Sequence, residues 1–247
     1  MQELQDEIHE QRELLESLDI DNLVNSSNVV YSDSFEDSIQ DDPQWNTQNQ
    51  NGASALVAGP KTRGNISYYT GRLSGYINLG NTGNGISSIT RSFEDKCYGL
   101  VSIELAFTVS PSEESKTLVI YEDNSYNIGE IEIDVANEEL ILESSGEQPI
   151  ADNVYLSADA LTWHTLKLIV DFENLEYVNL TIDGITYDLY DLANNQPYKL
   201  DNPEISVSEN PDTITVEYTC HGEGETWIDD FVLCNLNPYK DIGIKWV

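Results

Sequence analysis

The hydrophobic pattern changes near residue 29, from a helical repeat to an alternating one. Over residues 1–24 the repeat follows alternating steps of three and four residues, and glutamate and glutamine fill most of the other face. The positions on that repeat are Met1, Leu4, Ile8, Gln11, Leu15, Leu18 and Asn22. This spacing predicts a short coiled-coil-like helix, followed by a polar linker. We therefore divide the chain into a helical segment at residues 1–28 and a second domain at residues 29–247.

The predicted helix is too short to be stable by itself, because about three heptads are marginal in water. Its apolar stripe must be buried against another surface. We expect it to associate with copies of itself as a homo-oligomer, with a trimer favoured and a polar layer at Gln11. The contact residues would be Leu4, Ile8, Gln11, Leu15 and Leu18. The alternative is a helix that docks on its own domain.

From residue 29 onward, short runs alternate between apolar and polar residues. The clearest run is 101–109, in which every second residue is apolar. Shorter runs follow at 117–121, 128–134, 139–142, 163–170, 177–182, 185–189, 205–208, 213–218 and 227–233. Asp183-Gly184 between two of these runs is a strong hairpin signal, because a type I′ turn needs positive φ at both positions. We expect loops at residues 41–60 and 78–88, and the whole pattern predicts an all-β sandwich or barrel.

The charge of the chain limits its partners. The sequence has 247 residues, with 45 Asp and Glu against 11 Lys and Arg, and its formal net charge is -34. Nucleic acid and anionic lipid would be repelled, so we expect no nucleic acid and no membrane as partners.

No apolar run approaches the ~20 residues of a membrane span, and the first residues do not resemble a secretion signal. The composition resembles that of proteins from salt-loving (halophilic) organisms, in which molar salt screens self-repulsion. The alternative is an ordinary acidic protein that binds divalent cations.

The three cysteines are Cys97, Cys220 and Cys234, so at most one disulfide is possible. Their spacing does not match a zinc site, and we expect them to be small buried hydrophobic residues. A bridge between Cys220 and Cys234 would need two offset strands, because a tight hairpin places Cys220 opposite roughly residue 227.

Four stretches carry a resemblance to a known family by their order along the chain. They are residues 29–36, 163–168, 178–187 and 227–233. Together they resemble the concanavalin-like jelly rolls, which include laminin-G-like domains and carbohydrate-binding modules. The resemblance covers residues 29–236 and implies a jelly-roll sandwich in which the opening and closing strands pair. It implies a fold and not an activity.

The resemblance also implies a structural calcium ion where the first and last strands meet. The matching residues are Asp33, Glu36 and Asp229, with Asp230 as a reserve ligand. Alternation supports this set independently, because it places Asp229 on the same face as large apolar residues that should form the core. A buried ionised carboxylate is costly unless it is paired or binds a hard cation. The alternatives are a β-bulge that turns Asp229 outward, or hydrogen bonds that satisfy its carboxylate.

The best candidate for a ligand site is a predicted loop that combines tyrosines with an amide and a carboxylate. Its residues are Tyr121, Asp123, Asn124 and Tyr126. Aromatic rings stack on sugar faces, and Asp and Asn side chains hydrogen-bond to sugar hydroxyls. The alternative is that these tyrosines fill the sandwich core. Sequons for N-glycosylation begin at Asn25, Asn65 and Asn179.

The chemistry-bearing residues do not indicate an enzyme. The histidines, His9, His164 and His221, lie in different predicted elements. No nucleophile elbow or metal-hydrolase motif is present. Carboxylates are so abundant that no pair stands out as a glycosidase couple. We therefore expect a non-enzymatic protein.

Three functions fit these features. The first is a virion structural protein, such as a turret, fibre or spike of a tailed virus that infects a salt-loving archaeon. Its stem would contact other virion proteins, and its sandwich would face outward on the virion surface and bind host surface glycans. The second is a carbohydrate-binding or laminin-G-like adhesion domain of an extracellular or cell-surface protein. The third is a concanavalin-like glycoside hydrolase.

Overall fold

A computed structural model describes most of the second domain and shows that it is built from strands. The described residues are 29–33, 35, 45–56, 74–93, 99–122, 128–142, 149–158, 162–192, 194–200 and 214–236. The predicted helical segment, with Leu4, Ile8, Gln11, Leu15 and Leu18, lies outside them, as does the strand expected at 205–208. In the described part of the chain, no helix is long and apolar enough to cross a membrane.

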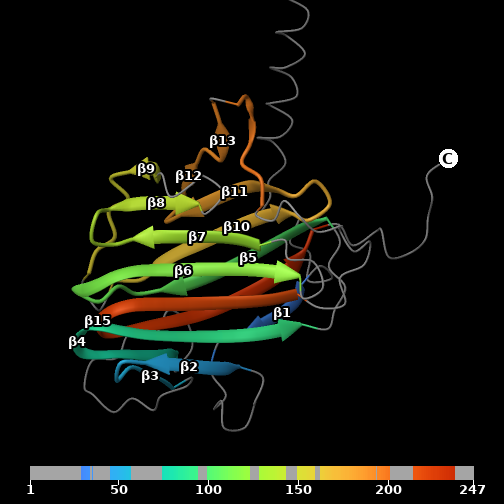
Figure 1. The fold of residues 1–247 in the computed structure, drawn as a ribbon. Helices are drawn as coiled ribbons and strands as arrows, with labels where there is room; N and C mark the ends of the chain where they lie inside the picture. The colour runs from blue at the N-terminus through green and yellow to red at the C-terminus, as the bar shows by residue number, and fades with distance from the viewer. Residues whose placement is uncertain are drawn as a thin grey trace, which may run out of the picture.

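The strands are β1 (Val29–Asp33), β2 (Asn46–Gln50), β3 (Ser54–Leu56), β4 (Gly75–Phe93), β5 (Leu100–Phe107), β6 (Ser112–Glu122), β7 (Ile128–Asp134), β8 (Glu139–Leu142), β9 (Pro149–Asp152), β10 (His164–Asp171), β11 (Glu176–Ile182), β12 (Ile185–Tyr187), β13 (Tyr190–Asp191), β14 (Gln196–Pro197) and β15 (Ile214–Asn235). They form two stacked layers (Figure 1). One layer runs in the order β9-β8-β7-β6-β15-β4, with β2 and β3 on β4. The other runs in the order β12-β11-β10-β5-β15-β1.

The long strand β15 belongs to both layers. Its first half pairs with β6 up to Glu223, and its second half pairs with β5 from Ile228 onward. The change takes place at glycines: Gly222 has a φ of 129°, and a Cβ there would lie 2.6 Å from the Glu114 backbone nitrogen. The sequence pattern predicted two separate strands, at 213–218 and 227–233. That division was wrong, because glycine within a strand can mark a bend instead of an end.

The expectation of loops at residues 41–60 and 78–88 was also wrong for most of the described residues in these ranges. Residues 46–50 and 54–56 form β2 and β3, and residues 78–88 lie within β4. The asparagines and glycines of this region do form an excursion, since Gly80 and Gly83 have φ of 78° and 76°. The ladder resumes at once, because Gly80 pairs with Gly224 and Gly85 with Gly222. A bulged excursion within a strand therefore has the same local signature as a loop.

The alternating pattern is confirmed by the core. Buried side chains from both layers form one hydrophobic cluster, which includes Val101, Ile103, Leu105, Phe107, Leu118, Ile120, Ile131, Ile133, Leu166, Leu168 and Val170. The Asp183-Gly184 hairpin is confirmed, with φ of 51° and 76° and with Ile182 opposite Ile185. The expected pairing of the opening and closing strands is confirmed by β1 on β15, where Asp33 lies opposite Phe231.

Two of the cysteines lie in this core region as free thiols. Cys220 and Cys234 are buried on the same strand, β15. Because one extended strand separates residues by roughly 3.3 Å each, the two sulfur atoms lie too far apart for a bridge. Both behave as the small buried hydrophobic residues that the spacing predicted.

Candidate functional site

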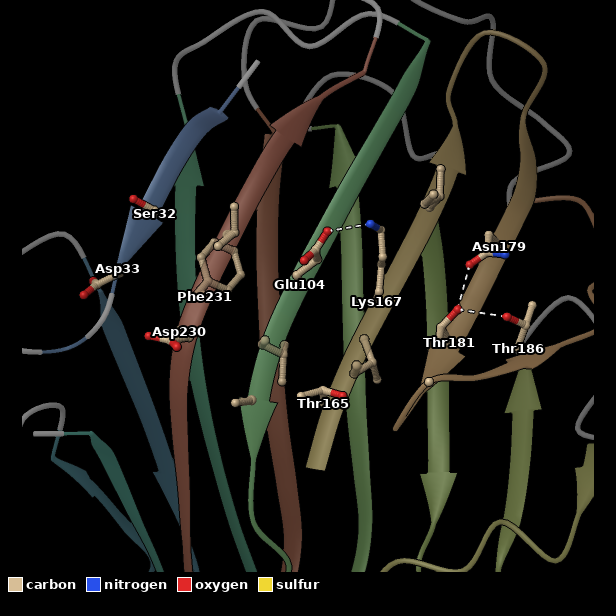
Figure 2. Close-up of a pocket in the computed structure, with 16 residues that line it drawn as sticks. Ser32, Asp33, Glu104, Thr165, Lys167, Asn179, Thr181, Thr186, Asp230 and Phe231 are labelled. Carbon is tan, nitrogen blue, oxygen red and sulfur yellow. Dashed lines mark hydrogen bonds and ion pairs between the residues drawn. The ribbon is translucent and has the colours of Figure 1, made fainter. Parts of the chain in front are cut away.

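A cavity of about 830 Å³ lies on the outer face of the layer that contains β1, β5, β10, β11, β12 and β15. We call it the outer groove. The residues labelled around it in Figure 2 are Ser32, Asp33, Glu104, Thr165, Lys167, Asn179, Thr181, Thr186, Asp230 and Phe231. Most of these side chains carry hydroxyl, amide, carboxylate or ammonium groups. The outer groove therefore combines these polar side chains with apolar lining residues of the same sheet, among them Leu105, Ile169 and Val232.

The period of two along each strand explains why polar side chains meet there. On β10, Leu166 and Leu168 point into the core, so Thr165 and Lys167 point to the opposite face. The same alternation on β5 places Glu104 beside them. The strands are adjacent and antiparallel, and Lys167 lies directly opposite Glu104. Each polar position is thus fixed by the apolar residues on either side of it.

A β-bulge in β15 adds a carboxylate to the groove and corrects one expectation. Asp230 has a φ of 46°, and the register with β5 shifts between Asp229 and Val232. The extra residue changes the phase of alternation, so Ile228 and Phe231 both face the core. Asp229 lies opposite Ala106, away from the core. Asp229 therefore does not share the face of Phe231, but its side chain is fully buried, as the notion of a costly buried carboxylate required.

The groove carboxylates are held by hydrogen bonds or by an ion pair. Lys167 Nζ lies 2.8 Å from Glu104 Oε1, with the two side chains 18% and 36% exposed. Asp33 accepts hydrogen bonds from Tyr31 Oη, the Phe35 backbone nitrogen and Trp45 Nε1, at 2.8, 2.7 and 2.8 Å. These donors hold the Asp33 carboxylate on the face of β1 that packs against the core, at the edge of the groove.

A chain of neutral hydrogen-bonding groups forms the other end of the groove. Thr181 Oγ1 donates to Asn179 Oδ1 at 3.0 Å and lies 3.4 Å from Thr186 Oγ1. In the described part of the chain the Asn179 amide nitrogen has no protein acceptor, so its N–H groups are available to water or to a ligand. Groups of this kind both donate and accept, which suits the hydroxyl groups of a sugar.

The structure separates the predicted ligand residues from this groove. Tyr121 lies on β6 in the opposite layer, where Ile120 points into the core. Its neighbours Asp123, Asn124 and Tyr126 lie outside the described residues. Tyr121 therefore does not line the outer groove, and the structure leaves the tyrosine loop itself untested.

The predicted calcium ligands are brought together only in part. Asp33 and Asp230 line the same groove, Asp229 is adjacent to it, and Glu36 lies outside the described residues. Asp229 is fully buried, and one of its oxygens accepts a hydrogen bond from the Asp230 backbone nitrogen at 2.9 Å. No group of three His, Cys, Asp or Glu side chains among the residues with described positions is arranged to hold a metal ion. Calcium binding through Glu36 stays a prediction.

Sequence reasoning missed the polar residues of β5, β10, β11 and β12 that line the groove. The missed residues are Glu104, Thr165, Lys167, Asn179, Thr181 and Thr186. Each occupies an outward position of a strand that the pattern did predict. The missing information was the strand order, which places these positions side by side.

Comparisons with known proteins agree with the architecture. No profile of a known protein family and no curated protein sequence matches the chain. Among solved structures, the cellulose-induced protein Cip1 matches with a TM-score of 0.50 and 13% identity, over 83% of this chain and 97% of that one. The carbohydrate recognition domain of Emp47p matches with a TM-score of 0.49 and 14% identity, over 85% and 98%. A protein of Bacillus subtilis with a galectin-like fold gives 0.49 and 13%, over 84% and 96%. The described domain is an all-β jelly-roll sandwich, a fold that it shares with Cip1.

Proposed function

We propose that the chain is a non-enzymatic saccharide-binding domain, and that the outer groove is its binding site. The observation that supports this proposal is the groove itself, which is lined by polar side chains from six neighbouring strands. Binding sites for polar ligands need donors and acceptors in fixed positions, and a packed sheet provides them. The groove volume of about 830 Å³ is large enough for more than one sugar ring.

The state of the carboxylates favours binding over hydrolysis. A glycosidase needs two carboxyl groups, one of which donates a proton and the other of which attacks or activates water. In the outer groove, Glu104 is paired with Lys167, and Asp33 accepts three hydrogen bonds. Both carboxyl groups are therefore already engaged by neighbouring groups of the protein. This supports a domain that holds a saccharide without cleaving it.

Recognition in this groove would depend on hydrogen bonds more than on ring stacking. Phe231 is the aromatic residue among the described lining residues, and it is only 1% exposed. Without an exposed ring, each lost hydrogen bond should have a clear effect on affinity. Thr181 is the best residue to test, because it links Asn179 to the neighbouring strand.

The test is binding of the full chain to immobilised neutral polysaccharides, such as galactan, mannan, xylan and β-glucan. The measurements are made at about 0.15 M and at molar salt, because a net charge of -34 distorts binding when it is not screened. We expect at least one polysaccharide to bind, and Thr181→Ala to weaken that binding roughly three- to tenfold. Thr117→Ala, a half-buried threonine of β6 in the opposite layer, is the matched control. Absence of binding to every saccharide tested, or equal loss in both variants, would contradict the proposal.

The described residues and the comparisons do not bear on the virion role or on the oligomerising stem. Attachment to host surface glycans from a virion surface and adhesion at a cell surface both remain compatible with a saccharide-binding sandwich. Both require the same groove chemistry.

A further inference from the structure

We propose that the outer groove selects neutral saccharides and rejects acidic ones, and that Glu104 determines this selectivity by neutralising Lys167. The inference rests on the proposed function, since it concerns the ligand class of the same groove. Acidic saccharides here are chains of uronic acids, which carry one carboxylate per sugar.

The groove lining carries more negative than positive groups. The described lining residues include two carboxylates that face the groove, from Glu104 and Asp230, and one ammonium group, from Lys167. The groove therefore carries excess negative charge at neutral pH. A ligand carboxylate placed there would lie among like charges, whereas a neutral sugar would meet only hydrogen-bonding groups.

The ammonium group among the described lining residues is already paired within the protein. Lys167 and Glu104 face each other across adjacent strands, and the distance between Lys167 Nζ and Glu104 Oε1 is 2.8 Å. The Lys167 side chain is only 18% exposed, so its ammonium group has little freedom to turn toward a ligand. A uronate would have to displace Glu104 to reach it. The Lys167 ammonium group is thus already neutralised by an ion pair within the protein.

The net charge of the whole chain also acts against acidic ligands. With a net charge of -34, the protein repels a polyanion before it reaches the groove. This long-range repulsion is removed by salt, but the local repulsion within the groove is screened much less. Selectivity that persists in molar salt would therefore come from the groove and not from the net charge.

The experiment compares saccharides that differ only by the carboxylate. β-1,4-Mannan is paired with β-1,4-polymannuronate, and α-1,4-linked galactose oligomers with α-1,4-linked galacturonate oligomers, and binding of the wild-type chain is measured at about 0.15 M and in molar salt. We expect the neutral member of at least one pair to bind and its uronate counterpart to bind at least tenfold more weakly at both salt concentrations. Equal or tighter binding of the uronate would overturn the inference and leave the proposed function intact. Binding of neither member of any pair, together with no binding to xylan or β-glucan, would overturn both.

A charge-neutral substitution identifies the residue responsible. Glu104→Gln preserves the shape of the side chain and releases Lys167, so the ratio of uronate to neutral affinity should rise about tenfold. Glu104→Gln combined with Lys167→Gln should lose that gain, because the free ammonium group is then absent. Glu132→Gln on β7 in the opposite layer makes the same change in net charge and should leave the ratio unaltered. A similar rise in Glu132→Gln, or none in Glu104→Gln, would show that Glu104 has no such role.

Discussion

Two of the lysine–glutamate pairs lie in very different surroundings. Lys167 and Glu104 meet at the rim of the outer groove, with side chains 18% and 36% exposed. Lys116 and Glu113 on β6 meet inside the sandwich, with side chains 1% and 0% exposed. The chemical groups are the same in both pairs. What differs is how much water surrounds them.

The buried pair is surrounded by further polar partners and by aromatic rings. Lys116 Nζ contacts Glu113 Oε1 at 2.5 Å, Thr226 Oγ1 at 3.0 Å and Cys220 Sγ at 3.5 Å. Glu113 Oε2 accepts a hydrogen bond from the Ser110 backbone nitrogen at 2.9 Å. Each charge therefore depends on the other, since neither is solvated by water. The pair in the groove, by contrast, can lose one member and let water or a ligand replace it.

The largest expected effect comes from removing one member of the buried pair. Lys116→Met leaves Glu113 without its cation in the core and should lower the free energy of unfolding by about 3–5 kcal/mol. Urea unfolding followed by tryptophan fluorescence measures this change. Lys116→Met combined with Glu113→Leu is the control, because replacing both charges with apolar groups should recover most of the loss. A single variant as stable as wild type would show that the pair is not structurally required.

A second effect comes from the thiol beside the buried pair. Burial raises the pKa of Cys220 from 9.0 to about 12, although the Lys116 ammonium group acts in the opposite direction. The folded state holds the thiol proton more tightly than the unfolded state, so this stabilisation is complete below pH 9.0 and is lost as the pH rises toward 12.

Unfolding midpoints in urea should therefore fall across that alkaline range. Cys220→Ala should reduce the fall, and it should not abolish it, because burial also raises the pKa of Tyr218. An identical pH profile in Cys220→Ala and wild type would exclude this contribution.

The smallest expected effect on stability comes from the groove pair. Glu104→Gln or Lys167→Gln should change the free energy of unfolding by less than about 1 kcal/mol, because the partner stays partly hydrated. The same urea titration measures it. A loss as large as that of Lys116→Met would place the groove pair in the same structural class as the buried one. The contrast between a structural pair and a binding pair would then fail.

Local patterning predicted the elements and the long-range pairing better than the site. The strands at 128–134 and 139–142, the Asp183-Gly184 turn and the contact between the first and last strands were all expected, because apolar alternation and turn chemistry are local signals. The burial of Lys116 was not expected, since the lysine stands in a polar run and its partners come from β6 and β15. The outer groove was missed for the same reason: Glu104 and Lys167 are 63 residues apart in sequence and become neighbours only through strand order.

Asn179 is a groove residue that can be glycosylated when the protein is produced in a eukaryotic host. It begins the sequon Asn179-Leu180-Thr181, and both polar residues of that sequon line the groove. An oligosaccharide attached there during passage through a eukaryotic secretory pathway would occupy the cavity and mask the very contacts that a free glycan needs. Material from a bacterial host lacks this attachment. The choice of expression system therefore decides whether a binding assay reports on an open groove or on one plugged by the protein's own glycan.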